Sequence, residues 1–187
     1  MDKQKSRHIG TLSPEMALLG QLYENPGHGY DLHRRVITDL GHVWHLSQSQ
    51  AYAILKRLEV HGDLSVEQIS QEKLPPRQLL HLTNQGRQRF LDWMEATSGG
   101  STRAIRLEFV TRLYFLQKYM PEKISQAFER QKKEACNQIR RLEDTYAGLP
   151  GDQVYNRISV QFRIKQLTLI LEWLDDCQMY FPLSSSQ

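Results

Sequence analysis

The order of the local patterns in residues 13–97 is the feature that most restricts what this chain can fold into. Apolar residues recur at helical spacing in four segments, and two short runs of β-forming residues come before the last of these segments. The expected order is therefore helix, helix, helix, hairpin, helix. A fold that is mainly α with one small β-hairpin accommodates this order.

The first two helices are indicated by residues at their ends. Ser13, Pro14 and Glu15 predict a helix start, because a hydroxyl can cap the helix, proline fits its first position and an acid favours its first turn. The segment NPGHG at 25–29 then interrupts the chain. A second helix that ends at Gly41 is expected over residues 30–41. Its apolar residues are Tyr30, Leu32, Val36, Ile37 and Leu40.

The third helix, in the segment LSQSQAYAILKRLEVHGDL at 46–64, has one apolar and one polar face. Ser47 is its expected N-cap. The apolar stripe consists of Ala51, Ile54, Leu55 and Leu58. The opposite face carries Ser49, Ala53, Lys56 and Val60, with Gln50 and Arg57 on one flank and Tyr52 on the other. The centre of this face has hydrogen-bond donors and no acid, which suits a phosphate-lined partner better than a dry protein interface.

Two runs at 64–72 and 77–83 predict a hairpin whose turn contains the residues KLPP. A fourth helix is expected over 83–97, capped by Thr83. This is the order of a winged helix-turn-helix domain, in which the third helix enters the major groove of DNA. The tip of the hairpin would then reach neighbouring phosphates.

Net charge is weak evidence for a nucleic-acid partner in this chain. The formal charge is +3, from 24 Lys and Arg against 21 Asp and Glu. Residues 1–99 hold 11 of each sign, and the excess, 13 against 10, lies in residues 100–187. Only the local placement of basic residues can therefore indicate DNA binding.

The sequence carries no signal for a membrane segment, for export or for a cofactor. No apolar run approaches the roughly 18–20 residues that span a bilayer, and the basic N-terminal decapeptide has no apolar stretch behind it. Cys136 and Cys177 stand far apart, which favours free thiols in a reducing compartment over a disulfide or a zinc site. A cytoplasmic protein without a cofactor is expected.

Motifs of known catalytic sites are missing from the sequence. It has no nucleophile elbow, no phosphate-binding glycine loop and no zinc-protease pair of histidines. His42 and His45 could share a helix-turn face, but no carboxylate or thiolate accompanies them, so contact with solvent or phosphate is their expected role. We therefore expect no enzyme, no catalytic residue and no metal site.

The segment TSGGST at 97–102 predicts a break between two domains, because paired glycines cost more entropy to order than a helix readily recovers. The expected parts are a winged-helix DNA-binding domain at 1–97, a linker at 98–102 and a helical dimerisation domain at 103–187. Helices are expected over 103–120, from Pro121 to the glycine-proline turn at 148–151, and from there onward.

The last helix predicts a homodimer, because it has two apolar stripes and one partner helix cannot cover both. One stripe has coiled-coil spacing and is the predicted dimer contact: Val160, Ile164, Leu167, Leu171 and Leu174. The other consists of Ile158, Phe162, Leu169, Trp173, Cys177 and Tyr180. A stripe left in water costs on the order of several kcal/mol, so a second copy of the chain is the expected cover. The alternative is that residues 103–147 cover both stripes within one chain.

Three segments resemble the PadR family of bacterial transcriptional regulators: ALLGQLYENPGHGYDLHRRV (17–36), the third-helix segment at 46–64, and PPRQLLHLTNQGRQRFLDWM (75–94). The shared motifs are P-x-HGY, LS-x-x-Q-x-Y, LKRLE-x-x-G, and PPR followed by LT-x-x-G. The resemblance implies a homodimeric winged-helix protein that binds double-stranded DNA, commonly a repressor that responds to a small molecule. Ala53 stands where proline often follows the tyrosine, and Gln78-Leu79-Leu80 replaces a Lys-aromatic-aromatic run. These departures leave the contacts of the wing open.

The resemblance places the DNA-binding residues on three elements. On the third helix they are Ser47, Ser49, Gln50, Tyr52 and Lys56, with Arg57 close by. Lys73 and Arg77 would belong to the wing, and Tyr30 would seat the second helix near a phosphate. Trp93 and Trp173 could line an effector pocket at the dimer centre; the alternative is that both are ordinary core residues.

Two functions from different classes remain. The first is a sequence-specific DNA-binding transcriptional regulator, a homodimer on a palindromic operator, in which an effector alters the spacing of the two recognition helices. The second is a winged-helix module that uses the same helix and wing to bind a protein. The acid-free centre of the third helix favours the first function.

Overall fold

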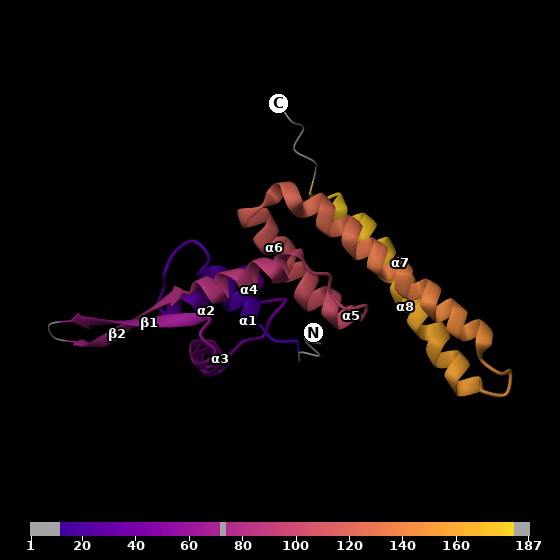
Figure 1. Cartoon of the computed structure of the whole chain (residues 1–187), viewed down its shortest axis with the longest axis horizontal. Helices are drawn as coiled ribbons and strands as arrows, with labels where there is room; N and C mark the ends of the chain where they lie inside the picture. The colour runs from indigo at the N-terminus through magenta and orange to yellow at the C-terminus, as the bar shows by residue number, and fades with distance from the viewer. Residues whose placement is uncertain (1–11, 72–73, 182–187) are drawn as a thin grey trace, which may run out of the picture. The chain divides into compact units, whose positions relative to one another are not determined.

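The chain divides into two compact units at a point within one helix. The structure, a computed structural model, describes residues 12–71 and 74–181 (Figure 1). The first unit ends at Phe90 and the second begins at Leu91. The predicted fold, mainly helical with one small antiparallel hairpin, is confirmed.

Four helices surround the hairpin in the sequence: α1 (Glu15–Gln21), α2 (Gly29–Leu40), α3 (Gln48–Val60) and α4 (Asn84–Glu95). The predicted cap of α1 by Ser13 is wrong: Pro14 occupies the N-cap position, and its side chain has no atom that could accept a hydrogen bond. Helix α2 begins one residue earlier than predicted. Gly41 caps its end, as predicted, but with right-handed backbone angles (φ −63°).

Helix α3 begins with a capping box, which confirms Ser47 as its N-cap. The Ser47 hydroxyl accepts a hydrogen bond from the Gln50 backbone N–H at 3.3 Å, and the Ser47 backbone N–H donates to Oε1 of Gln50 at 3.0 Å. The predicted core stripe of α3 is buried: Ala51, Ile54, Leu55 and Leu58. The opposite face is exposed, as the pattern predicts: Ser49, Ala53, Lys56 and Val60.

Strands β1 (Leu64–Gln71) and β2 (Leu74–Leu82) form the hairpin that projects from the helices of the first unit (Figure 1). The second strand begins three residues earlier than predicted, so the two prolines of KLPP lie in the strand rather than in the turn. Both strands of a two-stranded hairpin are edge strands, where proline is tolerated. Gly27 adds an isolated bridge to Leu80, with backbone hydrogen bonds of 3.1 and 2.9 Å. This bridge ties the loop before α2 to the hairpin.

The core of the first unit holds α3 in place. Thr83 caps α4 as predicted, since its hydroxyl accepts a hydrogen bond from the Gly86 backbone N–H at 3.0 Å. Side chains from all four helices are fully buried: Leu18, Leu19, Leu32, Val36, Ala51, Leu58 and Phe90. The polar face of α3 is thus presented by a packed apolar support.

The regular elements in the described part of the second unit are all helical. Its elements are α5 (Thr102–Ala104), the π-helix η1 (Ile105–Phe109), α6 (Val110–Tyr119), the 3₁₀ turn η2 (Pro121–Lys123), α7 (Ile124–Gly148) and α8 (Val154–Gln178). The helix predicted over 103–120 is therefore interrupted by a five-residue π-helical segment, in which Ile105, Leu107 and Phe109 are buried. A π turn accommodates one extra residue without ending the helix.

Helices α7 and α8 lie side by side (Figure 1). Of the predicted dimer stripe, Leu167 and Leu174 are 3% and 0% exposed within the single chain. Both are covered within the chain, where α7 packs along α8, and the predicted dimer contact of this stripe stays a prediction. The other three members, Val160, Ile164 and Leu171, are half-buried.

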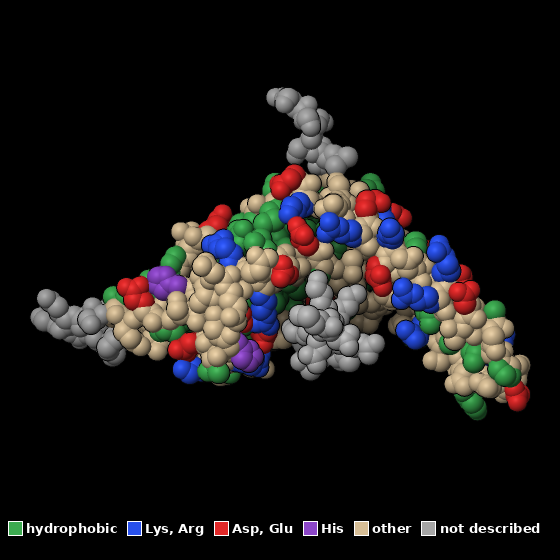
Figure 2. Space-filling view, viewed as in Figure 1, with side chains coloured by type: hydrophobic (Ala, Val, Ile, Leu, Met, Phe, Trp, Pro, Cys, Tyr) green, Lys and Arg blue, Asp and Glu red, His purple; other side chains and the backbone are tan. Residues whose placement is uncertain are grey.

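The second stripe of α8 is the more exposed one. Ile158, Phe162 and Leu169 are 57%, 61% and 61% exposed, whereas Trp173 and Cys177 are half-buried. Figure 2 shows hydrophobic side chains on the surface at the end of the α7–α8 pair where α8 begins, next to intermixed Lys, Arg, Asp and Glu. Three large side chains on one face of α8 are thus left in contact with solvent.

The segment between α4 and α5 is irregular but not loose. Ser98 is buried, and Gln131 of α7 accepts a hydrogen bond from its backbone N–H at 2.8 Å and donates to its carbonyl at 3.1 Å. Arg112 of α6 is also buried and donates to the Ser98 hydroxyl at 2.9 Å and to the Trp93 carbonyl at 3.0 Å. The predicted linker is therefore fixed to the second unit. The domain boundaries 1–97, 98–102 and 103–187 stay a prediction.

Burial of the Arg112 guanidinium lowers its pKa to about 10, and the charge of Glu108 acts against this shift. The group still carries its charge at neutral pH. None of the helices in the described ranges is both long enough and apolar enough to cross a membrane.

Candidate nucleic-acid interface

The first turn of α3 presents small polar side chains. Ser47, Ser49 and Gln50 are all exposed, and the hydroxyls of Ser47 and Ser49 lie 3.1 Å apart. The capping box engages the Ser47 hydroxyl and Oε1 of Gln50. Ser49 and the amide nitrogen of Gln50 are therefore the groups of this turn best placed to meet an external partner.

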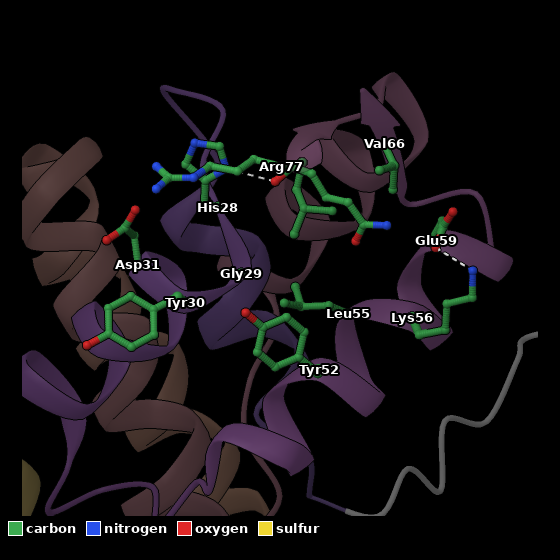
Figure 3. Close-up of a pocket in the computed structure, with 12 residues that line it drawn as sticks. His28, Gly29, Tyr30, Asp31, Tyr52, Leu55, Lys56, Glu59, Val66 and Arg77 are labelled. Carbon is green, nitrogen blue, oxygen red and sulfur yellow. Dashed lines mark hydrogen bonds and ion pairs between the residues drawn. The ribbon is translucent and has the colours of Figure 1, made fainter. Parts of the chain in front are cut away.

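A groove of about 790 Å³ lies between the start of α2, the middle of α3 and the hairpin (Figure 3). Four of the predicted DNA-binding residues line it: Tyr30, Tyr52, Lys56 and Arg77. Leu55, Val66 and Leu80 give it apolar walls. Figure 3 shows Arg77 near His28 at one end and Lys56 with Glu59 at the other. The fold thus brings together predicted site residues that lie up to 47 positions apart, from Tyr30 to Arg77.

Tyr52 packs over the first residue of α2. A Cβ at Gly29 would lie 2.9 Å from Cε1 of Tyr52 and 3.3 Å from Cδ1 of Leu55. Real side chains do not approach a Cβ so closely, so the position of the Tyr52 ring depends on glycine at 29. Tyr52 and Tyr30 are 45% and 53% exposed, and their rings are accessible from the groove side.

The two cations of the groove differ in their partners. The Lys56 ammonium donates to Oε2 of Glu59 at 2.9 Å, one turn along α3. Arg77 is exposed, and no carboxylate among the described residues pairs with it. One end of the groove therefore carries a cation that is available to an anion, and the other carries an ion pair.

Arg57 does not line the groove. Its guanidinium donates to the Glu15 carboxylate of α1, which also accepts from Arg89 of α4. Arg89 in turn donates to the buried Asp63. Arg57 is thus part of a network that joins α1, α3, α4 and the turn before β1.

This network sets the acidity of Glu15. Burial acts to raise the pKa of its carboxyl, but the hydrogen bonds and charges of Arg89 and Arg57 together outweigh that effect, so the pKa is lowered from its usual value. On the other side, burial acts to lower the pKa of Arg89, and Glu15 and Asp63 raise it. Both groups are therefore charged at neutral pH, as a structural ion-pair network requires.

The remaining predicted site residues lie elsewhere. Lys73 falls outside the described residues. Trp93 is half-buried, with the Arg112 guanidinium 4.9 Å from its ring centroid, and Trp173 is half-buried on α8. Neither tryptophan lines the groove or either of two smaller cavities formed by described residues of the second unit.

Sequence reasoning missed several residues of the groove, namely His28, Gly29, Asp31, Glu59 and Gln78. His28 and the Gln78 carbonyl are hydrogen-bonded at 2.8 Å, a contact between residues 50 positions apart that no local pattern indicates. Glu59, in contrast, could have been found, because it stands three residues after Lys56 and that spacing brings side chains together on a helix. Within the described part of the chain, no group of three or more His, Cys, Asp or Glu side chains could hold a metal ion.

Two family descriptions match separate parts of the chain. Residues 18–92 match the Transcriptional regulator PadR-like family, and residues 105–179 match Virulence activator alpha C-term. The first match runs from α1 to α4 and includes the groove. The second runs from η1 to the end of α8.

The chain is also similar to individual proteins. The negative transcriptional regulator PadR of Bacillus subtilis (strain 168) is 26% identical over 133 residues, which are 71% of this chain and 72% of that protein. A solved structure of Bacillus subtilis PadR in complex with operator DNA is 22% identical, with a TM-score of 0.45, over 89% of this chain and 98% of that chain. A second, in complex with p-coumaric acid, is 21% identical, with a TM-score of 0.40, over 88% and 92%. Residues 18–92 of this chain therefore belong to the PadR-like family of transcriptional regulators, and the curated relative carries the name of the same family.

Proposed function

We propose that this chain is a sequence-specific DNA-binding transcriptional regulator that acts as a homodimer, with α3 as its recognition helix and the β1–β2 hairpin as its wing. The observation that carries the proposal is the exposed polar face of α3 beside a groove that holds Tyr30, Tyr52, Lys56 and Arg77. Membership of a family of transcriptional regulators supports it. A relative that is named a negative regulator supports repression as the direction of control.

The proposed contacts follow from where each side chain lies. Ser49 and the Gln50 amide, at the N-terminal end of α3, meet base edges in the major groove. Tyr30, Tyr52 and Arg77 contact the sugar-phosphate backbone, because they line the groove between α3 and the wing. Ser47 acts chiefly as the helix cap. Lys73 is a further wing contact by its position in the sequence.

The exposed stripe of α8 supports the homodimer. Ile158, Phe162 and Leu169 lie on one face, since 158, 162 and 169 are separated by four and seven residues. Covering them against a second copy removes apolar area from water, at about 25 cal/mol per Å². Two recognition helices then read the two halves of a palindromic operator, which multiplies the selectivity of a single unit. Val160, Ile164 and Leu171 are proposed to extend this contact.

A small-molecule effector is proposed as a further partner, because regulators of this kind need a signal that changes their affinity for DNA. Trp93 and Trp173 are its proposed contacts. The half-buried state of both rings also agrees with ordinary packing, and Trp93 already carries the Arg112 guanidinium over its face.

The experiment that tests the proposed function is selection from a pool of random-sequence DNA duplexes by the purified full chain. We expect a palindromic sequence to be enriched and to bind more tightly than unselected duplex at several salt concentrations. Arg77→Ala should weaken binding to both duplexes alike and reduce the slope of log affinity against log salt by about 0.9, the loss of one phosphate contact.

The control for this experiment is Arg140→Ala, which removes the same charge from an exposed position on α7. It should leave both affinities close to those of the parent chain. Failure of the parent chain to retain any duplex would refute the proposed function and would favour the protein-binding alternative.

A further inference from the structure

We propose that Glu59 is a specificity-determining residue, whose carboxylate prevents the Lys56 ammonium from serving as a general phosphate contact and so keeps the binding of random DNA weak. This inference rests on the proposed function. It assigns a role to a carboxylate that the DNA-binding helix carries on its groove side.

The geometry of the pair supports this role. Lys56 Nζ and Glu59 Oε2 are 2.9 Å apart, and the two side chains are 72% and 34% exposed. Both line the groove, together with Tyr52 of the same helix. Figure 3 shows them at the end of the groove away from Arg77 and His28. The pair is therefore on the surface that a DNA strand would approach.

Glu59 differs from the other carboxylate of the groove. Asp31 forms an ion pair with Arg34, and Arg34 does not line the groove. This ion pair therefore neutralises no basic residue of the groove. Glu59 is paired with a groove cation. Glu59 neutralises Lys56. Arg77 is then the basic residue of the groove that has no carboxylate partner among the described residues. The groove is consequently less attractive to phosphates than its count of basic residues suggests.

A Lys–Glu pair distinguishes phosphates from base edges. A phosphate that approaches Lys56 meets the negative charge of Glu59 within the same few ångströms, and the pair as a whole releases no counterion from DNA. A base edge presents neutral acceptors such as O6 and N7 of guanine, which the carboxylate does not repel in the same way. The ammonium has three N–H donors, so it can keep its bond to Glu59 and still donate to a base. Glu59 thus weakens contacts with phosphates, which every DNA sequence offers. It permits contacts with base edges, which depend on the sequence.

The test is Glu59→Gln in the full chain, measured with unselected random duplex and with the duplex enriched by the parent chain. We expect affinity for random duplex to rise about three- to five-fold, as for an exposed ion pair, and its salt slope to steepen by about 0.9. Affinity for the selected duplex should change by less than about two-fold, so the ratio of the two affinities falls. Glu143→Gln, the same change at an exposed position on α7, is the matched control.

A double-mutant cycle with Lys56→Gln separates this role from a merely structural one. In a chain that already carries Lys56→Gln, Glu59→Gln should raise the affinity for random duplex by less than half of its effect in the parent chain. The reason is that the Lys56 ammonium, which Glu59→Gln would free from its ion pair, is no longer present. An unchanged affinity ratio in Glu59→Gln, or an equal effect in both backgrounds, would overturn the inference while leaving the proposed function in place. A parent chain that binds no duplex would overturn both.

Discussion

The Arg57 guanidinium donates two hydrogen bonds to one oxygen of the Glu15 carboxylate, from Nε at 2.9 Å and from Nη2 at 2.6 Å. This contact ties the last turns of α3 to the first turn of α1. Replacing Arg57 with alanine is expected to lower the free energy of unfolding by about 1 kcal/mol, a modest loss because the Arg57 side chain is half exposed. Urea unfolding followed by circular dichroism measures the change.

Arg35→Ala, at an exposed position on α2, is the stability control and should change the free energy of unfolding by less than about 0.5 kcal/mol. We also expect Arg57→Ala to leave the salt slope of DNA binding unchanged. A slope reduced by about one would show that Arg57 contacts a phosphate after all.

Lowering the pH should reduce the free energy of unfolding of the first unit, because Glu15 becomes protonated. Its folded-state pKa is lowered from 4.5, so the ion pairs contribute their full stability above pH 4.5 and lose it as the pH falls through the lowered value. Unfolding measured from about pH 6 to about pH 3 should show this decline. Glu15→Gln should be less stable at neutral pH and should decline less on acidification. A parallel decline in both proteins would assign the acid sensitivity to other carboxylates.

The sequence patterns of α3 correctly predicted the features that depend on contacts between residues close together in the chain. The Ser47–Gln50 capping box joins residues three apart, and the core stripe of α3 follows from helical spacing alone. Arg57 was placed on the same polar face by the same spacing, but its partner Glu15 lies 42 positions away and belongs to another helix. No pattern within α3 indicates that contact.

The C-terminal helices show the same limit in a different form. The sequence of α8 correctly indicates two apolar stripes, because both follow from the spacing of its residues. Which stripe α7 covers depends on the path of the chain through the turn at 149–153. Leu167 and Leu174 of the more heptad-like stripe are buried within the chain, and its other three members are half-buried.

Gly29→Ala should impair DNA binding without unfolding the protein. The added Cβ would lie 2.9 Å from Cε1 of Tyr52, and the exposed Tyr52 ring can move away at little energetic cost. We expect the affinity for the selected duplex to fall by about five-fold or more, the value of a lost contact of about 1 kcal/mol. Gly148→Ala, where nothing lies within 4 Å of the new Cβ, should bind normally. Normal binding by Gly29→Ala would remove Tyr52 from the proposed interface.

Phe162→Glu should dissociate the homodimer. Its side chain is 61% exposed in the single chain, so the substitution disturbs no core but places a charge in the proposed contact. Light scattering after gel filtration should give a monomer mass, against a dimer for the parent chain. Gln161→Glu, an exposed neighbour on the same helix, should remain dimeric. A dimer that survives Phe162→Glu would mean that the subunits meet through another surface.

Gln131→Ala should destabilise the second unit. The substitution leaves the buried N–H and carbonyl of Ser98 without the partners that lie at 2.8 and 3.1 Å. Leaving two buried backbone groups unpaired costs on the order of 2–4 kcal/mol. Urea unfolding measures it, with Gln126→Ala at an exposed position of α7 as the control. A loss equal to that of the control would show that water replaces the side chain.

The π-helical segment at Ile105–Phe109 holds one residue more than an α-helix of the same length would. Removing one residue between 105 and 109 would therefore let the segment relax into an α-helix, and the side chains of α6 would keep nearly the same direction relative to Thr102–Ala104. Arg112 would stay beside the Trp93 carbonyl and the Ser98 hydroxyl that now surround it. A deletion inside α7, by contrast, would turn every later side chain of that helix by about 100°. Single deletions should thus be tolerated in these five residues more readily than in the α-helical turns of α7.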